Sequence, residues 1–85
     1  MYQAIQFPDR EEWRDSVRAL CFPALVNGMQ LTCAIKDTTL AHRFGGDTPA
    51  SWIAAFREQR WDLEEEAEAL IQEQQEDDQG WIWLS

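Results

Sequence analysis

The sequence predicts a small α+β domain: an antiparallel sheet built on a central β-hairpin, two or three helices on one face, and a C-terminal strand. Three observations predict this fold. Asn27-Gly28 lies between two apolar runs, and this dipeptide favours a two-residue hairpin turn because both turn positions need positive φ. Residues 37–71 carry helix-start signals and apolar residues at helical spacing. Residues 80–84 form a final short apolar run of strand-forming residues.

The short strand expected before the hairpin covers residues 2–7, which alternate weakly in polarity, and ends at Pro8. The charged residues 9–15 are expected to form either a helical turn or a loop that leads into the hairpin. Their one large apolar residue, Trp13, is expected to cover an edge of the core.

The Asn27-Gly28 turn fixes the register of the two hairpin strands. Four apolar pairs then share one face: Val26 with Met29, Ala24 with Leu31, Phe22 with Cys33, and Leu20 with Ile35. We expect this face to lie on the core, whereas the opposite face is mixed in polarity. Cys21 and Cys33 fall on opposite faces, so their side chains diverge and we expect two free thiols, with Cys33 buried.

Two helices are expected directly after the hairpin. Asp37 is the expected N-cap of the first, and Gly45 ends it because glycine readily takes the left-handed conformation past a helix end. Thr48 is the expected N-cap of the second, with Pro49 at the first helical position.

A third helix is expected to start at Asp62, because Asp62 and Glu65 have the spacing of a capping pair, or at least a kink is expected near Arg60-Trp61. This start places Glu64, Glu65 and Glu66 in the first turn, where the helix dipole favours negative charge. The expected inward stripe consists of Leu63, Ala67, Leu70 and Ile71.

The C-terminal segment contains the residues that we assign to partner binding. Trp81 and Trp83 share one face of the last strand, and tryptophan is enriched in interface hot spots. A turn is expected just before it, at residues 77–80. Four acidic residues crowd the end of the last helix, where the dipole opposes negative charge, and no structural partner is expected for them. The candidate partner-binding residues are therefore Trp81, Trp83, Glu73, Glu76, Asp77 and Asp78.

The protein is acidic, with a formal net charge of −9 that comes entirely from one stretch. Residues 62–78 hold nine acids and no Lys or Arg, whereas the other 68 positions hold seven acids and seven bases. This distribution argues against binding to nucleic acid or to an anionic membrane, because both require basic patches.

Residues 1–85 are expected to form a single domain in the cytoplasm. No apolar run approaches the roughly 20 residues that span a membrane. The N-terminus shows no basic start followed by an apolar stretch, so no secretory signal is expected.

Five motifs are spread over nearly the whole chain, and almost all of their positions are structural. They are Ile5-x-Phe7-Pro8, Cys21-Phe22-x-Ala24-x-Val26-x-Gly28, Leu40 to Phe44, Phe56 to Arg60, and Gly80-Trp81-x-Trp83-Leu84. These motifs resemble those of the small, uncharacterised YrdB-like family of bacterial proteins. The resemblance implies an α+β fold with helices on an antiparallel sheet and a cytoplasmic bacterial protein. It implies no activity and no catalytic or binding residue.

The sequence predicts no catalytic residue, no metal site and no cofactor. His42 is the only histidine, and no Cys-x-x-Cys or His-x-x-x-His spacing exists. Gly45-Gly46 lacks the preceding strand and the following Lys-Ser/Thr of a phosphate-binding loop. We therefore do not expect an enzyme.

Three hypotheses for function follow from these observations. The first is a non-catalytic protein-interaction or regulatory module, whose partner is another protein and which is itself expected to be a monomer. Its candidate surface is either the mixed face of the hairpin together with Trp81 and Trp83, or the acidic face of the last helix meeting a basic partner. The alternative is a small-ligand-binding protein or an enzyme with a pocket between the helices and the sheet. The third is an acidic decoy of nucleic acid, based on the charged stretch.

Overall fold

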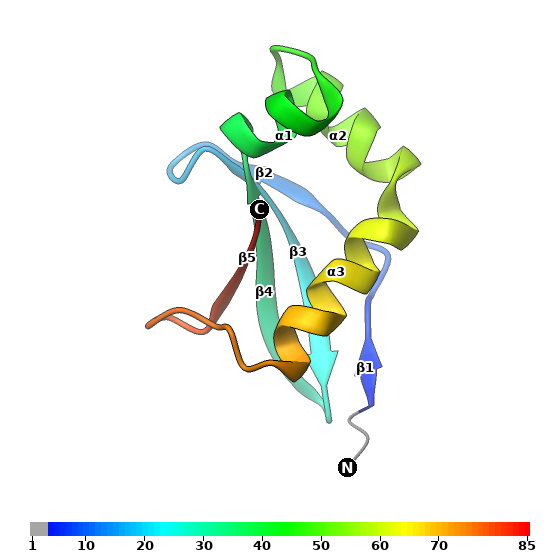
Figure 1. Cartoon of the computed structure of the whole chain (residues 1–85), viewed down its shortest axis with the longest axis vertical. Helices are drawn as coiled ribbons and strands as arrows, with labels where there is room; N and C mark the ends of the chain where they lie inside the picture. The colour runs from blue at the N-terminus through cyan, green and yellow to red at the C-terminus, as the bar shows by residue number, and fades with distance from the viewer. Residues whose placement is uncertain (1–3) are drawn as a thin grey trace.

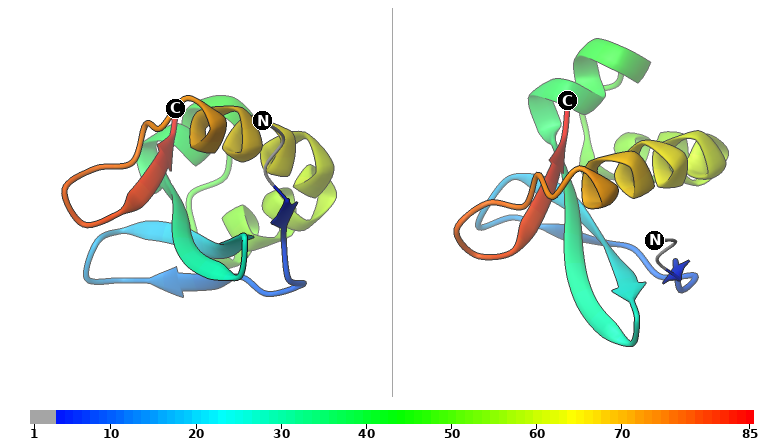
Figure 2. Two further views of the ribbon diagram at one scale, coloured as in Figure 1. Left: turned by 90° about the horizontal axis from the view of Figure 1, so that it is seen from below. Right: turned by 60° about the horizontal axis from the view of Figure 1, so that its bottom comes forward.

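The computed structural model describes residues 4–85 and contains one sheet and three helices (Figure 1). Its elements in chain order are β1 (Ile5–Gln6), β2 (Glu12–Arg14), β3 (Ala19–Val26), β4 (Met29–Lys36), α1 (Asp37–Phe44), α2 (Pro49–Glu58), α3 (Arg60–Gln72) and β5 (Trp81–Leu84). The helices lie on one side of the sheet, and its other side is left without a helix (Figure 2). The α+β class, the helices on one face and the C-terminal strand are as the sequence predicts.

The strand order is β1-β3-β4-β5, and β2 pairs with the same edge of β3 as β1 does. The one difference in orientation is β5, which pairs parallel to β4, so that the sheet is mixed and not wholly antiparallel. The cause is the long connection between them: the three helices carry the chain back across the sheet, as a parallel pairing requires.

The hairpin of β3 and β4 has the predicted register, from Val26 opposite Met29 to Leu20 opposite Ile35. Asn27 has φ = 52° and Gly28 has φ = 86°, so both turn residues adopt the left-handed conformation that the dipeptide predicts. The tip of the hairpin extends beyond the core, and Met29 there is 72% exposed. The expectation that Met29 lies on the core is therefore wrong, whereas its partner Val26 packs against the core.

Replacing Gly28 with valine is expected to lower the free energy of unfolding by about 1–3 kcal/mol, because a β-branched residue is strained at this φ. A Cβ at this position would meet no atom within 4 Å, so the loss would come from the backbone alone. Chemical denaturation of the two proteins measures the difference. Gly28→Asn is the control, since asparagine tolerates the left-handed region. Equal stability of the valine variant and the parent would contradict the turn assignment.

The segment before the hairpin forms two strands along the outer edge of β3. β1 begins at Ile5, and the part of the predicted strand in residues 2–3 lies outside the described residues. β2 is a strand where a helical turn or a loop is expected, which is a correction. Between them Pro23 of β3 faces neither β1 nor β2 in the pairing, because proline has no N–H to donate to a ladder.

The first two helices begin and end close to their predicted limits. In α1, Asp37 is the first helical residue and not the N-cap, although its carboxylate accepts a hydrogen bond from the Thr38 N–H at 2.7 Å. In α2, Thr48 is the N-cap as predicted, and Ser51 completes a capping box with it.

The third helix begins at Arg60, two residues earlier than predicted. Gln59 separates it from α2 with φ = −104° and ψ = 17° and provides no side-chain cap. Asp62 is therefore not an N-cap, and Glu64, Glu65 and Glu66 lie in the second turn and not in the first. Their effect on the helix dipole is correspondingly weaker than the sequence suggests.

The core consists of two apolar clusters on the two faces of the sheet. The larger one lies between sheet and helices and is formed by residues such as Phe22, Cys33, Phe56 and Leu63. The smaller one contains Cys21, and Trp81 and Trp83 pack against it. Cys21 and Cys33 are thus buried on opposite faces with free thiols, as the register predicts. Within residues 4–85 no helix is long and apolar enough to cross a membrane.

Candidate functional site

The face of the sheet that carries no helix is the candidate site, and we call it the helix-free face. The pairing brings its residues together in rows across the strands: Cys21 lies beside Ala34 and Trp83, and Pro23 beside Thr32 and Trp81. β2 adds Glu12 next to Cys21 and Arg14 next to Ala19. Alternation along each strand therefore places all of these side chains on one surface.

The two tryptophans form a pair on this face, with ring centroids 5.5 Å apart. Both side chains are half-buried against the smaller apolar cluster. The Arg14 guanidinium lies 5.2 Å from the Trp81 ring centroid, and the Lys36 ammonium 5.8 Å from that of Trp83. The pair is thus an aromatic surface with a cation beside each ring.

Asp77 joins the acidic end of the chain to this pair. One carboxylate oxygen accepts from the backbone N–H groups of Gln79 and Trp81, each at 2.9 Å, and the other accepts from Trp83 Nε1 at 2.8 Å. The Asp77 N–H donates to the Trp81 carbonyl at 2.8 Å. The expectation that Asp77 has no structural partner is therefore wrong, because its short side chain holds the turn that starts β5.

These hydrogen bonds lower the pKa of Asp77, with the Trp81 backbone N–H as the largest cause and the Trp83 indole as the next. Because the carboxyl is more acidic in the folded state, its contribution to stability is present above its unfolded pKa of about 3.9. That contribution is lost as the pH falls through the lower folded pKa.

Replacing Asp77 with asparagine is expected to lower the melting temperature at pH 7, because the new amide N–H₂ would meet the Trp83 indole N–H, donor against donor. The difference from the parent is expected to shrink as the pH falls below about 5 and to vanish once the carboxyl is protonated in both states. Thermal melts across this range measure it. Asp78→Asn is the control, and a similar loss in both variants would contradict the role of Asp77.

The other three acidic candidates stay exposed. Glu73, Glu76 and Asp78 make no side-chain hydrogen bond or ion pair with any residue in the described part of the chain. They lie in the connection between α3 and β5, and only Asp77 of this acidic group contacts the tryptophans. The structure therefore divides the predicted binding residues into a tryptophan pair held by Asp77 and three free carboxylates.

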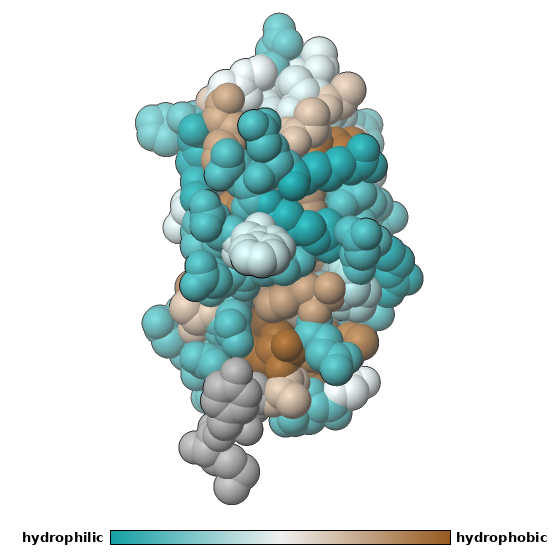
Figure 3. Space-filling view, turned by 90° about the vertical axis from the view of Figure 1, so that its right-hand side faces the viewer, coloured by the Kyte–Doolittle hydropathy of each residue, from teal (hydrophilic) through white to brown (hydrophobic). Residues whose placement is uncertain are grey.

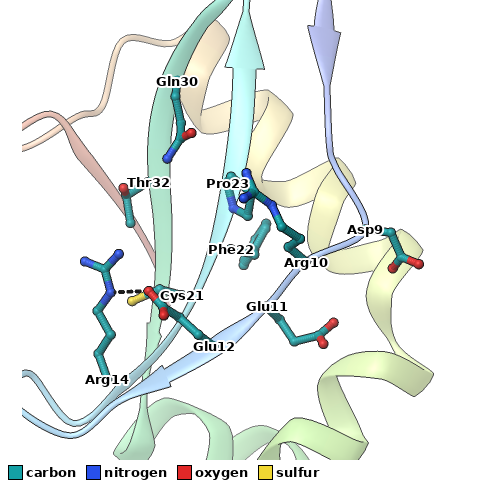
Figure 4. Close-up of a pocket in the computed structure, with 10 residues that line it drawn as sticks. All are labelled: Asp9, Arg10, Glu11, Glu12, Arg14, Cys21, Phe22, Pro23, Gln30 and Thr32. Carbon is teal, nitrogen blue, oxygen red and sulfur yellow. Dashed lines mark hydrogen bonds and ion pairs between the residues drawn. The ribbon is translucent and has the colours of Figure 1, made fainter.

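A hollow of about 470 Å³ opens where β1 and β2 leave Pro23 without a ladder partner (Figure 4). It lies at the edge of the helix-free face and not between helices and sheet, where the alternative hypothesis expects a pocket. Arg10 reaches toward β3 from the connection between β1 and β2, and Gln30 and Thr32 line the opposite side (Figure 4). Its lining residues are Asp9, Arg10, Glu11, Glu12, Arg14, Cys21, Phe22, Pro23, Gln30 and Thr32.

Two neutral side chains that could act as nucleophiles line this hollow, Cys21 and Thr32. Burial raises the pKa of the Cys21 thiol, which disfavours the reactive thiolate. Its lining includes no histidine, and His42 lies exposed on α1. Among residues 4–85 no group of three or more His, Cys, Asp or Glu side chains could hold a metal ion.

Two cations without an ion pair lie at this face. Of the seven basic residues, five form ion pairs with carboxylates: Arg14, Arg18, Arg43, Arg57 and Arg60. The remaining two, Arg10 and Lys36, have no such partner among the described residues; Arg10 lines the hollow and Lys36 lies over Trp83. In a protein with a net charge of −9, both are therefore available to an anionic group of a ligand.

Sequence reasoning missed both cations for different reasons. Arg10 lies in a connection whose path depends on the unpredicted strand β2. The hairpin register does place Lys36 on the mixed face, opposite Ala19. The interaction hypothesis also joins this mixed face with Trp81 and Trp83, as the position of β5 next to β4 confirms, but it assigns no role to Lys36.

The comparisons with known proteins agree on one family. The family model described as "Protein of unknown function (DUF1488)" matches residues 5–84. The chain is 73% identical over 84 residues to "Uncharacterized protein YrdB" of Escherichia coli (strain K12), covering 99% of each chain. It is 71% identical over 84 residues to the protein of the same name from Shigella flexneri, again covering 99% of each.

A solved structure extends the agreement to the fold. The crystal structure of a protein of unknown function from the DUF1488 family of Shewanella loihica PV-4 superposes with a TM-score of 0.91 at 31% sequence identity. The match covers 99% of this chain and 94% of that chain. None of these proteins has a stated activity, so the function of the chain is unknown. The chain belongs to the DUF1488 family of proteins of unknown function, as its YrdB-like motifs predict.

Proposed function

We propose that this protein is a non-catalytic protein-interaction module that binds its partner through the helix-free face. The observation that carries the proposal is the pair Trp81 and Trp83, which no helix covers and which lies beside the cations of Arg14 and Lys36. Tryptophan and arginine are the residues most enriched in interface hot spots. A half-buried tryptophan pair would be largely desolvated by a partner at little cost in side-chain entropy.

A small-ligand-binding protein is the second candidate, because about 470 Å³ is a volume typical of small-molecule pockets. Such pockets are lined mostly by apolar side chains, whereas half of the ten residues here are charged. An acidic decoy of nucleic acid is a weaker candidate. Three carboxylates of the acidic stretch accept hydrogen bonds within the fold, those of Glu64, Glu66 and Asp77. Fewer carboxylates are therefore free to imitate the phosphates of a nucleic acid.

We also propose that the protein is a monomer and that it is located in the cytoplasm. Two buried free thiols suit a reducing compartment. At the outer edge of β5, the Asp77 carboxylate accepts from the Trp81 N–H, and the Asp77 N–H donates to the Trp81 carbonyl. A strand edge whose backbone groups are already bonded resists pairing with a second chain.

The proposal is tested by affinity capture with two double variants of the same charge. Arg10→Ser with Lys36→Ser changes the helix-free face, and neither residue is in an ion pair. Arg18→Ser with Arg57→Ser is the matched control, which removes two charges elsewhere from side chains that are 55% and 66% exposed and whose ion pairs are therefore worth little. We expect the parent and the control to recover the same partner from a bacterial lysate and the face variant to lose it. Equal recovery by both variants, or none by the parent, would refute the proposal.

A further inference from the structure

A second hollow, of about 250 Å³, lies between β1 and α3. It is separate from the helix-free face and does not depend on the function proposed for that face. Figure 3 shows the side of the molecule on which apolar side chains gather in the lower half, flanked by hydrophilic ones. The residues that line the hollow are Ile5, Phe7, Trp61, Glu64, Glu65 and Glu68.

Four of these residues form one face of α3. Counted from Trp61, the three glutamates follow at the third, fourth and seventh positions, which is the spacing of a single helical face. Trp61 is 85% exposed, although Ile5 and Phe7 on the facing strand segment pack against the core. A large indole left in water beside partly buried apolar side chains is typical of a surface that a partner covers.

The rim of the hollow is negatively charged. Glu64 accepts from Arg60 Nε at 2.8 Å. Arg60 also pairs with Asp9 and Glu11, and Arg57 pairs with Glu11, so this network of three carboxylates and two guanidinium groups keeps one negative charge. Glu65 and Glu68 form no ion pair or side-chain hydrogen bond with any residue from 4 to 85. A ligand for this hollow must therefore offer an apolar group for its floor and positive charge for its rim.

We propose that this hollow docks a basic amphipathic segment of a partner protein. An apolar side chain of the segment contacts Phe7 and Trp61, and its lysine or arginine side chains pair with Glu65 and Glu68. Charge complementarity selects this occupant over an anionic membrane or a nucleic acid. A second copy fits less well, because each copy carries −9 and the two cations free to pair with the rim both lie at the helix-free face.

The test uses a synthetic peptide of leucine and lysine whose leucines share one helical face, with binding followed by fluorescence anisotropy. Glu65→Lys with Glu68→Lys reverses the rim, and Trp61→Ala removes the aromatic wall. Glu73→Lys with Glu76→Lys is the matched control, because it makes the same change in net charge away from the hollow. We expect the first two variants to weaken binding about tenfold or more and the control to weaken it by less than about threefold.

Three results would overturn the proposal: equal weakening by the two double variants, unchanged binding by Trp61→Ala, or equal binding of a peptide with the same residues in scrambled order. The proposal would also be overturned if the parent protein formed a dimer that the Trp61→Ala variant did not form, because the hollow would then bind a second copy of the chain. Thermal melts confirm that the variants fold, and Glu65→Gln with Glu68→Gln offers a milder change at the same place.

Discussion

Replacing Phe56 with alanine is expected to lower the free energy of unfolding by about 3–5 kcal/mol. Its side chain on α2 is completely buried, and its ring centroid lies 4.9 Å from that of Phe22 on β3. The Arg60 guanidinium lies 5.2 Å from the same ring. The substitution would leave a cavity between sheet and helices in a domain whose total stability is on the order of 4–13 kcal/mol for its size. Urea denaturation followed by circular dichroism measures the loss.

Trp61→Ala is the control for this experiment, because it also removes a large aromatic ring but from an exposed position. A change within about 0.5 kcal/mol is expected for it. If Phe56→Ala costs less than about 1 kcal/mol, α2 does not pack on the sheet as described. The ring of Phe22 would then lack the neighbour that completes its burial.

The parts of the fold that could be predicted are those in which local chemistry determines geometry. Asn27-Gly28 requires a two-residue turn, and that turn alone sets eight residue pairs. Thr48-Pro49 determines the start of α2 in the same way. The predicted start of α3 at Asp62 is wrong, because a capping pair of only two residues is a weak signal. The chain instead breaks at Gln59, and α3 begins directly after it at Arg60.

The parts that could not be predicted depend on long-range pairing. β2 has only three residues, two of them charged, and it is a strand because the edge of β3 offers it hydrogen-bond partners. The parallel pairing of β5 did leave a signal: the 44 residues between β4 and β5 are long enough for a crossover connection.

For the candidate site, the sequence showed which residues face the same way but not what lies next to them. Trp81 and Trp83 are on one face by simple alternation. Their neighbours Arg14 and Lys36 come from two other strands, and only the strand order brings them together. Asp77 could have been recognised from its position before a turn, since aspartate there commonly accepts from backbone N–H groups.

Replacing Arg60 with methionine is expected to lower the free energy of unfolding by about 2–3 kcal/mol, because it leaves a largely buried carboxylate with too few partners. Arg60 donates to Glu11 at 2.8 Å, to Glu64 at 2.8 Å and to the Pro8 carbonyl at 2.7 Å. The side chains of Arg60 and Glu11 are only 15% and 13% exposed. These bonds join the connection between β1 and β2 to the start of α3, so removing them would destabilise both segments. Methionine keeps most of the apolar stem, which restricts the change to the charge and its hydrogen bonds.

Arg57 provides the matched control, because it pairs with the same Glu11 carboxylate from a side chain that is 66% exposed. Arg57→Met is expected to cost no more than about 0.5–1 kcal/mol, as exposed ion pairs do. In the Arg60→Met background, Glu11→Gln is expected to restore part of the lost stability, since it removes a largely buried charge that Arg57 alone would then compensate, and it keeps the shape. If the two methionine variants were equally stable, Arg60 would be an ordinary surface residue. A further loss on Glu11→Gln would show that the carboxylate keeps good partners without Arg60, and that the connection between β1 and β2 is held by other contacts.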